Sequence, residues 1–120
     1  MQAHKKYDLE ERTGRFGEDV IIFAKGIPEN AVTKRIIAQL VGAATSVGAN
    51  YCEADCSESS RDFVHKMSIA NKEAKESKHF LRMIAVAFEE NADQGQKLLK
   101  EATELNLIFT TIIKKVKEKL

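Results

Sequence analysis

The sequence predicts an all-α fold, an antiparallel up-down-up-down four-helix bundle. Between Arg61 and Phe88, apolar and small residues recur with an unbroken 4-3-4-3 spacing. That spacing keeps one face of a helix against a core, and no strand can use it. Three further stretches have the same amphipathic period, and the turns between the four are short. Short turns between amphipathic helices favour antiparallel neighbours.

Length and composition indicate one ordered domain over residues 1–120. Hydrophobic residues make up 43% of the chain and charged residues 31%, with a single proline. The net charge of +1 attracts neither nucleic acid nor an anionic membrane globally, so such a partner requires a local patch. No leader is recognisable, and no apolar run approaches the roughly 20 residues that span a bilayer. We expect a cytoplasmic protein with no membrane contact.

The first helix is expected to begin at Asp8, which would cap it, and to end near Gly26 and Pro28. The polar, basic residues before it, 1–7, are expected to fray. Two apolar residues, Ile21 and Ile22, lie off the core face and are candidates for a second contact surface. The predicted core residues are Leu9, Thr13, Phe16, Val20 and Phe23.

The second helix is expected to begin between Asn30 and Thr33 and to end near Asp55. Its segment 42–49 consists almost entirely of small residues, which allow backbones to approach closely. Asn50 is a polar residue on the core face and needs a partner if it is buried. The predicted core residues are Ile36, Leu40, Ala43, Val47, Asn50 and Ala54, widened by Ile37, Ala44 and Tyr51.

The third and fourth helices follow two further capping signals, Ser59 with Asp62 and Asp93 with Gln96. Surplus apolar residues beside the core faces predict a homo-oligomer. The third helix has core residues Phe63, Met67, Ala70, Ala74, Ser77, Leu81, Ile84 and Phe88. The fourth has Leu98, Ala102, Leu105, Phe109, Ile112 and Val116, with extra apolar residues Leu99, Leu107, Ile108 and Ile113.

The outer face of the third helix is basic and carries no carboxylate. Copied around an oligomer, such a face would give a strong local field suited to phosphates. The histidines would add charge at low pH. A solvated face whose lysine stems cover apolar surface is the alternative interpretation. The face consists of Arg61, His65, Ser68, Lys72, Lys75, His79, Arg82 and Val86.

Catalytic and metal motifs are not recognisable. A di-metal bundle needs Glu-x-x-His on two facing helices, whereas Glu76 with His79 and Asp62 with His65 share one helix. The two cysteines, Cys52 and Cys56, are four residues apart and are expected to be reduced thiols. We therefore expect no enzymatic activity, no cofactor and no metal.

A family resemblance rests on motifs spread over nearly the whole chain. They are Gln39-Leu40, the segment Ala44-Thr45-Ser46-Val47-Gly48-Ala49-Asn50-Tyr51-Cys52-Glu53-Ala54, Asp62-Phe63, and Lys72-Glu73-Ala74-Lys75-Glu76-Ser77. With them the chain resembles the bacterial four helix bundle proteins, also called 23S ribosomal RNA intervening-sequence proteins. It departs from the family's usual pattern at His79-Phe80, where relatives look more aromatic.

The resemblance implies a ring-like homopentamer without established enzymatic activity. The implied fold is similar to the accessory variability determinant of diversity-generating retroelements, a basic pentamer that binds nucleic acid and a reverse transcriptase. Four residues match family motif positions, Asn50, Glu53, Glu73 and Glu76. For these we expect a structural role, as a buried polar cluster that joins the second and third helices.

Two hypotheses for function follow. The first is a non-enzymatic homo-oligomeric bundle that associates with RNA, or with a nucleic-acid-associated protein, through the basic face of the third helix. The contacting residues would be Arg61, His65, Lys72, Lys75, His79 and Arg82. The alternative is a protein-protein interaction scaffold with no nucleic-acid role, which the near-neutral charge and the surplus apolar surface favour.

Overall fold

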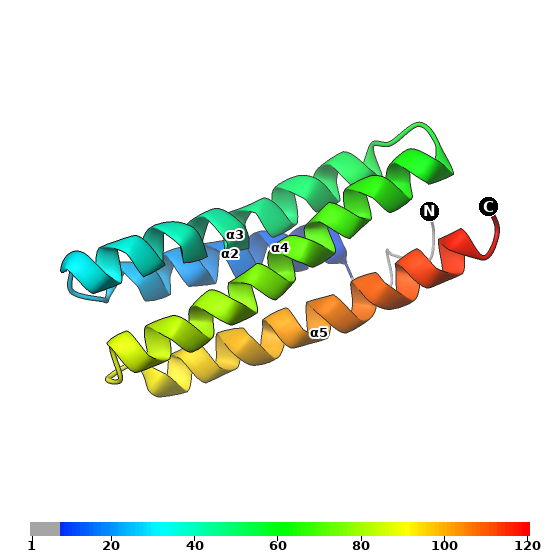
Figure 1. The fold of residues 1–120 in the computed structure, drawn as a ribbon. Helices are drawn as coiled ribbons and strands as arrows, with labels where there is room; N and C mark the ends of the chain where they lie inside the picture. The colour runs from blue at the N-terminus through cyan, green and yellow to red at the C-terminus, as the bar shows by residue number, and fades with distance from the viewer. Residues whose placement is uncertain (1–7) are drawn as a thin grey trace.

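Four helices make up the structure, a computed structural model that describes residues 8–120 (Figure 1). They are α2 (Leu9–Lys25), α3 (Ala31–Asp55), α4 (Ser60–Ala87) and α5 (Ala92–Lys117). Within residues 8–120 no strand is present, so the predicted all-α four-helix bundle is confirmed. The N-terminal segment for which fraying was predicted lies outside the described residues.

The helices pack around one long apolar core. α3 shares its most extensive contact with α4, α4 packs on α5, and α2 packs on α3. The contact between α2 and α5 is the least extensive of the four. Phe16, Phe63, Met67 and Phe109 are among the largest side chains that are fully buried, and they come from three different helices. α4 therefore lies at the centre of the packing, between α3 and α5.

The predicted core positions are largely confirmed. In α4, seven of the eight seam residues are buried, and Phe88, just past the helix end, is half-buried. All five predicted core residues of α2 are buried as well. Ile36 and Val116 are half-buried because they lie near the first and last turns of their helices, where fewer neighbours cover them.

The predicted capping side chains are confirmed at two of the four helix starts. The Asn30 carboxamide accepts hydrogen bonds from the backbone N–H groups of Val32 and Thr33, and Ser59 Oγ accepts one from Asp62. Asp8 precedes α2, but its backbone is left-handed (φ 46°) and its side chain forms no capping hydrogen bond. A capping side chain normally requires extended backbone. Asp93 lies inside α5, one residue past the first, so the predicted cap there is wrong.

The small residues of α3 allow a close approach to α2, as predicted. A Cβ placed on Gly48 would lie 3.4 Å from the backbone carbonyl of Thr13, at the tight limit of ordinary contacts. A Cβ on Gly42 would meet nothing within 4 Å. The close contact of α2 with α3 thus depends on Gly48, whereas Gly42 faces open space.

Apolar surface remains exposed on several helices. Ile21 and Ile22 of α2 are 40% and 61% exposed, Val86 of α4 is 80% exposed and Leu107 of α5 is 65% exposed. None of the helices in the described part of the chain is long and apolar enough to cross a membrane.

Candidate nucleic-acid interface

The outer face of α4 lies opposite its core face, as the period of the sequence predicts. The core face is occupied by Phe63, Met67, Ala70 and their periodic successors, so positions on the far side of the helix point to solvent. All six residues predicted to contact nucleic acid are exposed there: Arg61, His65, Lys72, Lys75, His79 and Arg82.

These six side chains have no acidic partner within residues 8–120. The ion pairs of this part of the chain involve Arg12, Arg15, Lys34 and Lys66 instead. Of these four cations, Lys66 is the closest in sequence to the residues of the basic face, and its Nζ forms an ion pair with Glu53 of α3 at 3.0 Å. The charges of the basic face are therefore available for an external anion.

A groove between α4 and α5 extends part of this face. It has a volume of about 670 Å³, and Lys72 and Lys75 of α4 line it together with Lys114 and Lys117 of α5. Glu118 is its one acidic residue, and Asn71 and Thr110 add polar groups. Four lysines on two helices thus surround one depression, which is an arrangement suited to a phosphate group.

The other predicted contacts lie elsewhere along α4. His79 and Arg82 line a different, mainly apolar groove near the turn between α4 and α5. Arg61 and His65, in the first turns of α4, line neither groove. The basic residues form a row along α4, and only the central ones, Lys72 and Lys75, line the groove that contains the lysines of α5.

Sequence reasoning missed the contribution of α5 to this site. Lys114 and Lys117 lie in the last turn of α5, where cations are favourable for the helix itself, and the sequence does not show which helix lies beside them. The sequence does contain one sign of a shared site, because the two lysines are three residues apart and therefore lie on one side of α5.

The expected buried polar cluster is only partly formed. Asn50 is half-buried, and its amide donates to the Ser46 carbonyl of its own helix at 2.8 Å rather than to α4. The prediction that Glu53 is buried is wrong, because its side chain is 57% exposed. It does join α3 to α4, but through the ion pair with Lys66, which lets its carboxylate stay in water.

Glu73 and Glu76 lie one turn apart, and both are half-buried. Burial raises the pKa of Glu73 above its ordinary value, and the negative charge of Glu76 raises it further, while Lys72 acts in the opposite direction. The pair is therefore a source of repulsion within α4. No third acidic or histidine ligand joins it, and the described residues contain no group of three or more such side chains that could hold a metal ion.

A buried polar contact that the sequence did not reveal joins α4 to α5. Asn106 is 7% exposed, and its Nδ2 donates to the backbone oxygen of Asn71 at 3.0 Å and to the Asn71 side-chain oxygen at 2.6 Å. The Asn71 amide in turn donates to Thr110 Oγ1 at 3.2 Å. This chain of bonds fixes the two helices beside the lysine-lined groove.

The two cysteines, Cys52 and Cys56, are free and exposed. Partial burial raises the pKa of the Cys52 thiol, and the negative charge of Glu10 adds to the effect. A raised pKa keeps the thiol protonated and less reactive. The structure therefore gives no support to nucleophilic chemistry at this pair.

Comparison with known proteins identifies a family and solved structures of similar fold. The family model described as "23S rRNA-intervening sequence protein" matches residues 5–111. A crystal structure of a protein of unknown function from the S23 ribosomal protein family of Bacteroides thetaiotaomicron is 28% identical in sequence. Its TM-score is 0.76, over 88% of this chain and 97% of the other. None of the curated proteins matches the chain.

Proposed function

Since the chain belongs to the 23S rRNA-intervening sequence protein family, we propose that it is a non-enzymatic bundle that binds RNA through the basic face of α4. The observation that carries the proposal is the lysine-lined groove between α4 and α5. Lys72, Lys75, Lys114 and Lys117 converge there without ion-pair partners among residues 8–120. Phosphate groups are the ligands that such a site favours.

The mode of binding follows from the residues that the face contains. Its charged side chains are lysines and arginines, and no Phe, Tyr or Trp lies among its eight positions. Lysine and arginine hold phosphates, whereas sequence readout of RNA requires stacking and base-edge contacts. Binding should therefore follow the phosphate backbone and the shape of the RNA more than its sequence.

The assembly that we propose is a cytoplasmic homo-oligomer, a pentamer by analogy with the family resemblance. In each subunit the helices would run up, down, up and down. The three short connections and the packing of each helix on the next support this order. Exposed Ile22, Val86 and Leu107 support self-association, because apolar side chains of this size gain from being covered. Repetition of the basic face around a ring would strengthen RNA binding through multivalency.

The test is a fluorescence-polarisation titration of structured RNA and of single-stranded DNA at low and moderate salt. The wild type is compared with a variant that changes Arg61, Lys72, Lys75 and Arg82 to Glu, and with a second that changes Lys72, Lys75, Lys114 and Lys117 to Glu. We expect salt-sensitive binding by the wild type and loss of binding in both variants. The second should fail even though Arg61 and Arg82 remain.

A matched control changes four exposed cations outside the site, Lys25, Lys34, Arg35 and Lys100, to Glu. This variant has the same net charge as the other two, so it separates a local site from a general charge effect. Size-exclusion chromatography must show that each variant keeps the assembly of the wild type. Absence of binding by the wild type at low salt, or equal loss in the control, would contradict the proposal.

A second candidate function is a protein-protein scaffold. The observation that favours it is the exposed apolar surface of α2, where Ile21 and Ile22 lie beside the acidic residues Glu18 and Asp19. A partner with an apolar and basic surface would suit this face. The candidate predicts that Ile22→Lys abolishes partner capture while RNA titrations show no binding by any form of the protein.

A further inference from the structure

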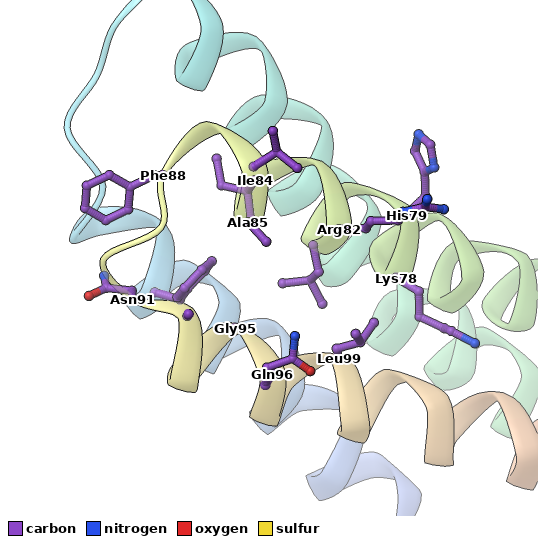
Figure 2. A pocket seen from close by; sticks show the side chains of 14 residues that line it. Lys78, His79, Arg82, Ile84, Ala85, Phe88, Asn91, Gly95, Gln96 and Leu99 are labelled. Atoms are coloured by element: carbon purple, nitrogen blue, oxygen red, sulfur yellow. The ribbon is translucent and has the colours of Figure 1, made fainter.

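A second groove lies between the C-terminal half of α4 and the first turns of α5 (Figure 2). Its volume is about 520 Å³, within the range of about 300–1,000 Å³ that small-molecule sites occupy. Its walls are mainly apolar, formed by Phe23, Leu81, Ile84, Phe88 and Leu99. A ligand held here must therefore present an apolar body.

The charged residues on the wall, Lys78 and Arg82, have the same sign. Lys78, His79 and Arg82 line the groove, and no carboxylate does. In Figure 2, Lys78 extends from α4 past Leu99, at the end of the groove away from Phe88, and Gln96 lies on the other side of Leu99 along α5. The His79 ring points to the other side of α4. Lys78 thus places a cation at one end of the groove.

Lys78 is half-buried and takes part in no ion pair of residues 8–120. An ammonium group that is partly removed from water gains from an anionic partner. Apolar walls with a cation at one end describe the complement of an amphipathic acid.

We propose that this groove binds a small amphipathic carboxylate, with its hydrocarbon body against Leu81, Ile84 and Leu99 and its carboxylate on Lys78. The site is separate from the lysine-lined groove and does not depend on RNA binding. Phosphate backbone is a poor occupant because the walls offer mainly apolar contact. The alternative occupant, an apolar side chain from a second copy of the chain, is distinguished by the experiment.

The experiment titrates the full chain with decanoate, decanol and decyltrimethylammonium by isothermal calorimetry, each below its micellar concentration. We expect saturable binding of decanoate, weaker binding of decanol and none of the cationic amphiphile. Octanoate should bind about fifteenfold more weakly than decanoate, because it lacks two methylenes and each buried methylene contributes about a fourfold change in affinity. Similar affinity for the anionic and the cationic amphiphile would overturn the proposal.

Two variants locate the site. Lys78→Met keeps an apolar stem without the charge and should weaken decanoate about tenfold while leaving decanol unchanged. Lys115→Met, at an exposed position that lines neither groove, is the matched control and should bind like the wild type. Ala85 is exposed on the rim, so Ala85→Phe should fill the groove without disturbing the core and abolish binding of both ligands.

Oligomeric state is measured on the same samples. If Ala85→Phe loses its assembly and the wild type shows no saturable binding of decanoate, another chain covers the groove. That result would overturn the proposal. Equal binding of decanoate by the wild type and Lys78→Met would overturn the assigned role of Lys78 and the preference for an acid.

Discussion

The guanidinium of Arg12 in α2 holds the carboxylate of Glu101 in α5 with two hydrogen bonds, from Nε to Oε2 at 2.7 Å and from Nη2 to Oε1 at 2.8 Å. Nη2 also bonds Glu104 at 3.0 Å. The hydrogen bond with Glu101 is the main cause that raises the pKa of Arg12 above its ordinary value. These bonds join two helices that pack on each other less extensively than the helices that follow one another along the chain.

We predict that Arg12→Lys lowers the free energy of unfolding by about 1 kcal/mol, since an ammonium group cannot reproduce the two parallel bonds. Both side chains are about 70% shielded from water, which reduces screening of the pair. Urea unfolding at one fixed protein concentration measures the change. Arg15→Lys, whose partner Glu11 is on the same helix and exposed, should give no measurable change. Equal behaviour of the two variants would show that the bidentate pair adds nothing.

Two glycines of α3 should respond oppositely to substitution. Gly42→Ala should raise the free energy of unfolding by about 0.5–1 kcal/mol, because its Cβ would enter open space and alanine favours helix. Gly48→Val should lower it by about 2 kcal/mol, because the added carbons would press on the Thr13 backbone. Gly42→Val is the size-matched control, and its stability should stay close to wild type. Thermal unfolding followed by circular dichroism would compare the three, and destabilisation by both valines alike would contradict the assigned contact.

Substitution of Asn106 measures how much a buried amide contributes to stability when only its nitrogen is hydrogen-bonded. Its Oδ1 is buried without a partner in the described structure, while its Nδ2 is bonded to Asn71. We predict that Asn106→Leu changes stability by less than about 1 kcal/mol, since the lost bonds are offset by removal of the orphan oxygen. Asn50→Leu, which removes only a bond within α3, should cost equally little. If it disrupts assembly instead, the amide has a role in packing between chains.

Asn106→Asp should be far more damaging at neutral pH, by about 3 kcal/mol, because it buries a charge beside the Asn71 oxygens. Burial raises the pKa of the new carboxyl in the folded protein above its unfolded value. The loss should therefore shrink as pH falls, when the folded state takes up the proton. Urea unfolding at pH 7 and pH 4 compares the two conditions. An equal loss at both would mean that steric change rather than charge is the cause.

A second pH dependence of stability is expected from Glu73. Its pKa in the folded protein lies above the ordinary 4.5 because of burial and the charge of Glu76. Stability is then favoured below pH 4.5 and falls as pH rises through the raised value. Glu73→Gln should raise the melting temperature at pH 7 and leave it nearly unchanged at pH 4. Glu89→Gln, at an exposed position, is the control and should change neither. A gain of the same size at both pH values would assign the effect to something other than ionisation.

The core faces of the helices could be predicted from the sequence because burial follows the 3.6-residue period closely. Phe63, Met67 and Ile84 fall on one stripe of α4, and all three are buried. The exposed position of the basic residues follows from the same geometry, since Lys72 and Lys75 are on the opposite stripe. Period alone fixes which side of a helix faces the core.

The contacts between helices could not be predicted from the sequence. Asn71 and Asn106 form a hydrogen bond although 35 residues separate them. Lys72 and Lys117 line one groove only because α5 packs on α4. The buried polar cluster was predicted from motif positions, which do not show where the carboxylate at the end of a long side chain lies. Glu53 is long enough to pair with Lys66 at the surface, and that is where it lies.

The position of α4 between α3 and α5 has a mechanical consequence. Arg61 and Arg82 are 21 residues apart on an uninterrupted helix, a separation of about 30 Å at 1.5 Å per residue. Both neighbouring helices brace that span along its core face, so the charges on its outer face keep a fixed spacing. A nucleic acid that binds there meets a stiff template, and it is the nucleic acid that must adapt its path to the protein.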